Sequence, residues 1–325
     1  MSNTEKAPEQ VLCEEAHAAA PWLIEAREVP LGGPRQMLVK RTLPARGLTL
    51  IGAWCFVDHY GPTPVRNAAG MRVPGHPHTG LQTVSWLFEG EIEHRDTAGH
   101  HAFVRPGEVN IMTAGSGIAH SEFSTPATEV LHGVQLWVAL PAAARFVERS
   151  FEHYVPEIFD YQSGAARVLV GEFAGQHSPV KSYTELLGVE LSFHEAGTVE
   201  LELNTNYEHG ILVDTGTITA EGIRAASADL VYFPPGRGRL ELEISEKTRV
   251  MLLGGVPFGE KLVMWWNFIA RDHDEILQFR ERWESERGLA ADGETRSGMF
   301  GSFPSEWPST LAAPELPNVR LKPRE

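Results

Sequence analysis

Two pairs of side chains that can bind a metal, each spaced two residues apart, give the strongest chemical signal in this sequence. His76 and His78 lie in the run GHPH, and His120 and Glu122 lie in the run GIAHSE. Residues i and i+2 of a β-strand project from the same face, so each pair can direct two donors toward one point. If the two strands are neighbours, three imidazoles and one carboxylate converge. The spacing therefore predicts a site for one divalent metal ion.

The donor set narrows the choice of metal and indicates reactivity. Imidazole and carboxylate ligands without a thiolate suit Fe, Mn, Ni, Cu or Zn. Four ligands leave one or two positions of a five- or six-coordinate ion open for a substrate or dioxygen. A single H-x-H is common without a metal, but two such pairs beside glycines, which let the backbone approach closely, favour metal binding. The other histidines of interest are predicted to be structural or to lie outside the ligand set: His94, His100, His101, His132, His153, His194 and His209.

Short apolar runs separated by glycine and proline surround these motifs. From about residue 21 to 140, runs such as LQTVSWLFEG and VLHGVQLWVAL are typical of strands in a sandwich or barrel. A second block, about 166–255, contains VELEL and LELEI, whose alternation indicates strands with one wet face. The order of strands and glycine-rich bends in the first block recurs in the second, which predicts a duplicated β domain. We expect an all-β fold of two stacked barrels with a few short helices and an extended C-terminal tail.

The predicted boundaries divide the chain into four parts. Residues 1–20 are expected to form a flexible leader, 21–150 the metal-binding barrel, 151–287 a barrel without metal plus a helix, and 288–325 a Pro/Gly-rich tail. Helices are predicted at about 142–153, after Pro141, and at about 272–286. The tail should have little regular structure, with the aromatic residues of FGSFPSEW as candidates to dock on the barrels.

Composition excludes several classes of protein. The chain has 325 residues, 42% of them apolar, and a formal net charge of −15, which argues for a folded protein and against direct binding to nucleic acid or anionic lipid. It shows neither a secretory signal pattern nor an apolar window near the roughly 20 residues of a membrane helix. Two scattered cysteines, Cys13 and Cys55, fit a reducing compartment. We therefore expect a cytoplasmic location.

Longer motifs resemble the pirin family of the cupin superfamily. These are FVDHYGP, GHPHTGLQTVSWLFEGEIEHRD, PGEVNIMTAGSGIAHSE, GVQLWVALP and LLGGVPFGEKLVMWWNFIARDHDEI, and together they span roughly residues 25–290. The resemblance implies a bicupin with two barrels face to face and one metal, usually Fe(II), in the N-terminal barrel only. It also implies His76, His78, His120 and Glu122 as ligands. One departure is Gln82, where pirins usually have glutamate. We expect it to lie in the pocket near the metal but outside the ligand set, where the changed charge would alter substrate binding or redox tuning.

The resemblance implies two classes of function. The first is a quercetin 2,3-dioxygenase type of enzyme that acts on a flavonol and O2, with Glu122 as general base. The second is a non-enzymatic, redox-responsive regulator that binds a transcription factor or metabolic enzyme through its metal-bearing barrel. For the enzyme, Gln135 is a candidate hydrogen-bonding group. Candidate pocket walls are Trp86, Phe88, Phe103, Met112 and Trp137, although aromatic residues at strand spacing are more often plain core.

Overall fold

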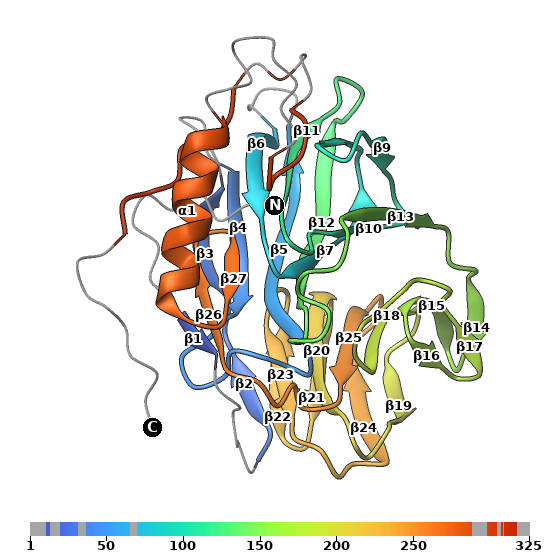
Figure 1. Cartoon of the computed structure of the whole chain (residues 1–325). Helices are drawn as coiled ribbons and strands as arrows, with labels where there is room; N and C mark the ends of the chain where they lie inside the picture. The colour runs from blue at the N-terminus through green and yellow to red at the C-terminus, as the bar shows by residue number, and fades with distance from the viewer. Residues whose placement is uncertain are drawn as a thin grey trace.

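Two β-barrels stacked one above the other form the body of the protein (Figure 1). The computed structural model describes residues 11–13, 20–31, 37–65, 70–287, 298–303, 307 and 309–316. Each barrel combines one seven-stranded sheet with one four-stranded sheet, as the repeated strand pattern predicts. Among the described residues, no helix is long and apolar enough to cross a membrane.

The N-terminal barrel closes around a mixed apolar and polar interior. Its seven-stranded sheet has the order β13 (Ser150–Tyr154), β10 (Val109–Thr113), β7 (Leu81–Glu89), β12 (Val130–Ala139), β5 (Trp54–Pro64), β4 (Met37–Leu43) and β3 (Arg27–Leu31). Its four-stranded sheet has the order β6 (Arg72–His78), β11 (Ile118–Ser124), β8 (Ile92–Asp96) and β9 (His101–Val104). Both predicted metal-binding motifs lie in the smaller sheet.

The C-terminal barrel repeats this plan with an apolar interior. Its larger sheet has the order β14 (Phe159–Tyr161), β15 (Gly164–Val170), β18 (Leu186–Phe193), β25 (Arg249–Gly255), β20 (Glu208–Thr215), β23 (Leu230–Phe233) and β2 (Trp22–Ile24). Its smaller sheet has the order β19 (Gly197–Glu202), β24 (Arg239–Ile244), β21 (Thr217–Ala220) and β22 (Ile223–Ala226). A two-stranded hairpin, β16 (Glu172–Phe173) and β17 (Gln176–His177), lies beside it. Leucine, valine and phenylalanine fill the interior, consistent with the alternation in LELEI.

The two seven-stranded sheets pack against each other and form the largest apolar cluster. Trp54, Trp86 and Leu136 of the N-terminal barrel contact a group that includes Leu212 and Met251 of the C-terminal barrel. The Nε1 of Trp54 crosses this interface and donates to the carbonyl oxygen of Leu187 at 3.0 Å. Burial of large side chains on both sheets stabilises the pair of barrels as one unit.

The two ends of the chain exchange elements between the barrels. Strand β2 completes the larger sheet of the C-terminal barrel, although it precedes the whole N-terminal barrel in sequence. Strand β1 (Val11–Cys13), within the predicted flexible leader, pairs with β26 (Leu262–Trp265), which pairs with β27 (Phe268–Ala270). Helix α1 (His273–Arg287) follows and buries Trp283 in a cluster with Ala119 of β11. The C-terminal end thus covers the N-terminal barrel.

One predicted helix is wrong and one is confirmed. The helix expected at 142–153 is absent, because residues 142–146 form turns and Ser150–Tyr154 pairs with β10 as an edge strand. A backbone carbonyl of Val147 lies where a side chain at Gly115 would be, so this segment follows the barrel surface closely. The helix expected at 272–286 is α1, the only helix in the described part of the chain.

The described part of the tail crosses the outside of the metal-motif strands. Thr310 forms a parallel bridge with Gly75, and the Leu311 amide donates to the Gly75 carbonyl oxygen at 2.8 Å. The ring of Trp307 occupies the space that a Cβ at Gly75 would need. Phe300 is fully buried against Trp283. Aromatic docking of the tail on the barrel is therefore confirmed for these residues.

Candidate metal centre

The strands β6 and β11 are neighbours, as the two-pair argument requires. In their antiparallel register, His76 lies opposite His120 and His78 lies opposite Ile118. The alternation of side chains then places His76, His78 and His120 on one face. A register shift between His120 and Glu122 bends β11 at this point, and Glu122 lies opposite His94 of β8.

The three imidazoles converge closely and are shielded from solvent. One ring nitrogen from each lies within 4.8 Å of the others, and the Nε2 atoms of His78 and His120 are 3.0 Å apart. All three side chains are fully buried. Burial lowers the pKa of His76 to about 3 and lowers those of His78 and His120 well below the usual value. The rings are therefore neutral at pH 7, which is the form that binds metals.

The hydrogen bonding of His76 supports a ligand role. Its Nδ1 donates to the Pro74 carbonyl oxygen at 2.9 Å, which leaves a lone pair on Nε2. That buried Nε2 has no hydrogen-bond partner among the described residues. Glu122 is also buried, and its charge partly opposes the effect of burial on the pKa of His76. Its carboxylate is not part of the group of ligand atoms within 4.8 Å of one another, which the three imidazoles alone form. Three neutral nitrogens and one carboxylate fit a divalent first-row ion.

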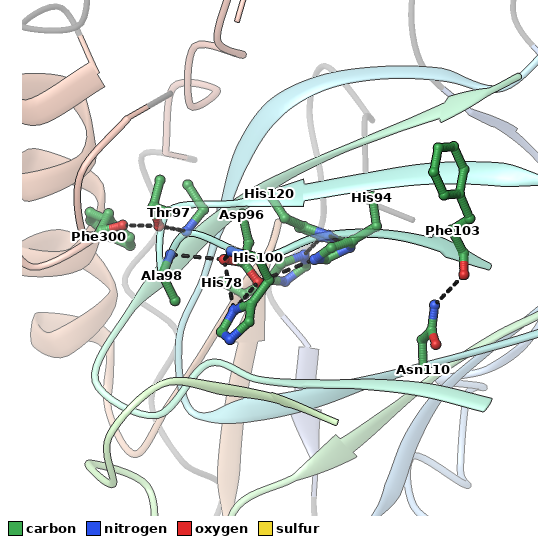
Figure 2. A network of polar contacts seen from close by, with 11 residues as sticks. His78, His94, Asp96, Thr97, Ala98, His100, Phe103, Asn110, His120 and Phe300 are labelled. Atoms are coloured by element: carbon green, nitrogen blue, oxygen red, sulfur yellow. Dashed lines mark hydrogen bonds and ion pairs between the residues drawn. The ribbon is translucent and has the colours of Figure 1, made fainter. Parts of the chain in front are cut away.

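A chain of polar side chains runs from His120 toward the barrel surface (Figure 2). The Nδ1 of His120 lies 3.3 Å from the Nδ1 of His94, and the Nε2 of His94 lies 3.2 Å from Asp96 Oδ2. Asp96 also accepts from His100 Nδ1 at 3.0 Å. His94 and Asp96 form an H-x-D pair with the same i, i+2 spacing as the ligand pairs. That spacing is the signal by which the sequence could have singled them out.

Several predicted pocket residues do face the ligands. Trp137 contacts His78 edge-on with ring centroids 5.1 Å apart. Gln135 and Met112 lie on the same interior face, since they pair with Ser85 and Thr83 respectively. Ser85 donates to Gln135 Oε1 at 2.9 Å, whereas Gln135 Nε2 has no hydrogen-bond partner among the described residues.

Sequence reasoning missed Tyr60, which also lies near the ligands. Burial, followed by the charges of Glu122 and Asp58, raises the pKa of Tyr60 well above its usual value. The phenol therefore stays protonated and offers an O–H donor. Its oxygen is buried without a hydrogen-bond partner in the described residues. Tyr60 lies within the motif FVDHYGP.

Four other predicted residues do not face the ligands. Gln82 and Trp86 pair with Val138 and Val134, so they point toward the C-terminal barrel. Gln82 donates to Thr113 Oγ1 and to the Lys181 carbonyl oxygen, and Trp86 donates to Glu190.

Phe88 and Phe103 also lie elsewhere. Phe88 lies under the guanidinium of Arg249 in the C-terminal barrel, and Phe103 packs against Arg105 at the outer end of β9. The expectation that Gln82, Trp86, Phe88 and Phe103 line the metal pocket is corrected accordingly. Strand β7 is buried on both faces, so its sequence gave no indication of which face is interior.

A second group of potential ligands lies between the barrels. His59 and His132 each place Nε2 close to Asp214 Oδ1, at 2.7 and 2.6 Å, and Arg249 Nε lies 2.6 Å from Asp214 Oδ2. Burial would raise the pKa of Asp214, but the hydrogen bonds from His132 and His59 and the charge of Arg249 hold it far below its usual value. Both carboxylate oxygens are already occupied, so we interpret this group as an inter-barrel clasp.

Two stacked barrels, with buried imidazoles converging in the first, define the protein as a bicupin with a candidate metal centre. Residues 36–138 match the family described as pirin, and residues 188–288 match the pirin C-terminal cupin domain. A Pseudomonas aeruginosa protein provisionally named quercetin 2,3-dioxygenase is 38% identical over 98% of both chains. The chain belongs to the pirin family.

Solved structures agree with this assignment. A quercetin 2,3-dioxygenase from Acinetobacter baumannii superposes with a TM-score of 0.84 at 34% identity, covering 93% of this chain and 98% of that one. A bacterial pirin from Escherichia coli, solved in complex with nickel(II), has a TM-score of 0.58 at 19% identity, covering 73% of this chain and 99% of that one. The second likeness supports the fold.

Proposed function

We propose that this protein is a metal-dependent dioxygenase that acts on flavonols, of the quercetin 2,3-dioxygenase type. The observation that carries the proposal is the convergence of three buried, neutral imidazoles, with the buried Glu122 two residues beyond His120. The names of the Pseudomonas relative and the Acinetobacter structure support this choice of substrate. Fe(II) is the proposed ion. The nickel in the Escherichia coli pirin makes Ni(II) the first alternative, ahead of Mn, Cu and Zn.

The charges of the site suit a flavonol anion. Three neutral imidazoles and one carboxylate carry a formal charge of −1, which a divalent ion would change to +1. A bound flavonol anion would bring the buried site to neutrality once its 3-hydroxyl proton has left the site, which reduces the cost of burying each charge. When bound, the ion would supply Lewis acidity toward the hydroxyl oxygen and an open position for O2 chemistry.

The chain's own groups would orient the substrate and move its proton. We assign Glu122 as the base that accepts the 3-hydroxyl proton and passes it out of the site, because it is a buried carboxylate two residues beyond His120 whose charge acts on His76. The Tyr60 hydroxyl and the Gln135 Nε2 are buried donors that lack hydrogen-bond partners among the described residues, and they would donate to substrate oxygens. Trp137, stacked on Phe56 with centroids 4.0 Å apart, would form one apolar wall.

Oxygen consumption with quercetin tests the proposal directly. The Fe(II)-loaded protein should consume O2 with quercetin, and the metal-free protein should not. Glu122→Gln should lower the rate by more than it lowers metal content, since the amide can still coordinate weakly but cannot accept the proton. Glu241→Gln, at an exposed position of β24, is the matched control and should change neither.

One outcome would overturn the enzymatic proposal. If the protein holds one ion per chain but no flavonol supports O2 consumption, the dioxygenase assignment is wrong. The redox-responsive regulator would then be the function to test, by capture of a protein partner with the Fe(II) and Fe(III) forms.

A further inference from the structure

We propose that His94 is a positioning residue for the metal centre: backed by Asp96, it fixes the tautomer of His120 so that Nε2 offers its lone pair to the ion. The inference rests on the metal centre of the proposed function but not on the flavonol reaction. It concerns the chain of contacts from Asp96 through His94 to His120 drawn in Figure 2.

The direction of each hydrogen bond in this series of contacts follows from the Asp96 carboxylate at its end. An ionised carboxylate only accepts, so the Nε2 of His94, 3.2 Å from Asp96 Oδ2, must carry the proton. In a His94 ring that carries this one proton, Nδ1 is an acceptor. Its neighbour at 3.3 Å, the Nδ1 of His120, therefore carries the proton of that ring. This leaves the lone pair of His120 on Nε2, the atom that lies 3.0 Å from His78 Nε2.

Asp96 is held so that it can set this direction. Its Oδ1 accepts from the amides of Ala98 and His100 at 2.8 and 3.0 Å, which orients Oδ2 toward His94. His100 Nδ1 adds a further contact at 3.0 Å to Oδ2. The carboxylate is thus anchored by the turn that follows β8, and its position does not depend on the metal.

His94 is also held in place by packing. Its side chain is 5% exposed, and the ring of Phe151 from β13 lies against it with centroids 4.8 Å apart. Phe151 contacts the His100 ring as well, at 5.5 Å. The 3.3 Å contact with His120 is long for a hydrogen bond, so packing of the His94 ring is what keeps its Nδ1 aligned.

The two ligand rings His76 and His120 reach the same tautomer by different means. His76 donates from Nδ1 directly to the backbone carbonyl oxygen of Pro74, which cannot be altered by a side-chain substitution there. His120 depends on the side chains of His94 and Asp96. Groups of this kind orient metal-binding histidines and set their basicity, and their loss typically costs about 10- to 100-fold in metal affinity.

Asp96→Asn is the sharpest test, because it should reverse donor and acceptor in each hydrogen bond from residue 96 to His120. The asparagine carbonyl can keep the Ala98 and His100 amides, which leaves its NH2 facing His94 Nε2. His94 must then accept at Nε2 and donate from Nδ1, so His120 must carry its proton on Nε2, where the ion would bind. We expect a loss of about 10-fold or more in Co(II) and Ni(II) affinity in chelator-competition titrations.

Imidazole nitrogen NMR of the metal-free protein reads the tautomer itself. Long-range ¹H–¹⁵N spectra should show the His120 proton on Nδ1 in the wild type and on Nε2 in Asp96→Asn. The same tautomer and the same affinity in both proteins would overturn the inference. These readouts do not involve flavonol or O2, so absence of dioxygenase activity would leave the inference standing.

A pair of His94 variants decides the matter if Asp96→Asn does not fold. His94→Gln keeps an acceptor for His120 and a donor for Asp96 within one amide, and should retain metal affinity within about threefold of wild type. His94→Leu removes both and should lose about 10-fold or more. His101→Gln, at a half-exposed ring on β9, is the control and should have no effect. Equal affinities for His94→Gln and His94→Leu would contradict the positioning role.

Discussion

His76, His78 and His120 lie inside the N-terminal barrel, whereas His59 and His132 lie on the face of the same barrel that packs against its partner barrel. Both groups are buried and both bring potential ligand atoms within 4.8 Å of one another. They differ in what the nitrogens face. In the clasp, Asp214 accepts from both histidines and from Arg249. In the interior group, the Nε2 atoms of His78 and His120 face each other.

The difference shows that proximity of ligand types does not by itself make a metal site. At the clasp, the guanidinium of Arg249 already neutralises Asp214, and a cation placed there would be repelled by it. At the interior group, the hydrogen-bond direction at His76 leaves a lone pair pointing inward. The two groups therefore differ in the hydrogen-bond partners of their ring nitrogens and in the charges that lie nearby.

The largest expected difference between the groups is in metal content. His120→Ala should reduce bound metal from one ion per chain to none, because a central ligand is lost. His132→Ala should leave one ion per chain. Elemental analysis of both purified variants checks this, and two ions per chain in the wild type would show that the clasp, or the C-terminal barrel, binds metal after all.

Substitution in the clasp, by contrast, should lower the stability of the protein and leave its metal content unchanged. Asp214→Ala removes the shared acceptor of His59, His132 and Arg249, and should lower the free energy of unfolding by about 3 kcal/mol. This is the lower end of the usual range for breaking a buried pair, since the Arg249 side chain is 27% exposed and can reach water. Urea unfolding measures the loss, and unchanged metal content is expected. Glu243→Ala on the exposed side of β24 is the control.

In the metal-free protein, the two groups should lose their contributions to the free energy of unfolding in different pH windows. Histidines with lowered pKa values stay neutral when folded but protonate when unfolded, so their contribution is present above about pH 6.5 and falls by about 1.4 kcal/mol per pH unit for each ring below it. For His76 this continues to about pH 3. Asp214, whose pKa is lowered, contributes above about pH 4 and loses its contribution only below it.

Unfolding at a series of pH values separates these windows. His76→Gln should flatten the dependence between about pH 6 and 4, and Asp214→Asn should flatten it only below about pH 4. His209, with its pKa lowered by burial to about 4, adds equally to all variants. An identical effect of both substitutions in the higher window would contradict the assignment.

The smallest expected effect is at Gln82. Gln82→Glu, the residue usual in the family, would replace the Nε2 donor by a carboxylate oxygen facing the Lys181 carbonyl oxygen. We expect a loss of about 1 kcal/mol in thermal or urea unfolding with metal content unchanged. A change in metal affinity without a change in stability would place Gln82 functionally at the metal after all.

The spacing in GHPH and GIAHSE was sufficient to predict that His76, His78 and His120 converge, because a strand fixes the direction of alternate side chains. The same period of two could not say which face of β7 is interior, since that strand is buried on both sides. The sequence therefore predicts Gln82 and Trp86 in the metal pocket, although both face the other barrel. For His94 the sequence predicts only a structural role or a place outside the ligand set, because spacing alone does not show that its ring contacts Asp96 and His120.

The exchange of strands between the two barrels could not be predicted from the sequence either. Strand β2 joins a sheet whose other members begin at residue 159, and no local pattern in Trp22–Ile24 specifies that partner. The helix expected after Pro141 failed for a related reason. Residues 150–154 have a free sheet edge beside them in β10, and pairing with it outweighs a modest helix propensity.

The docking of Phe300, Trp307 and Thr310 on the ligand strands also sets an order of events during synthesis. Chains fold from the N-terminus as they are made, so β6 and β11 can pair long before Phe300 and Trp307 leave the ribosome. During that interval the outer face of the ligand strands near Gly75 is uncovered. The segment that covers it is made after both barrels, so the outer face of β6 at Gly75 stays exposed until Trp307 and Thr310 can dock.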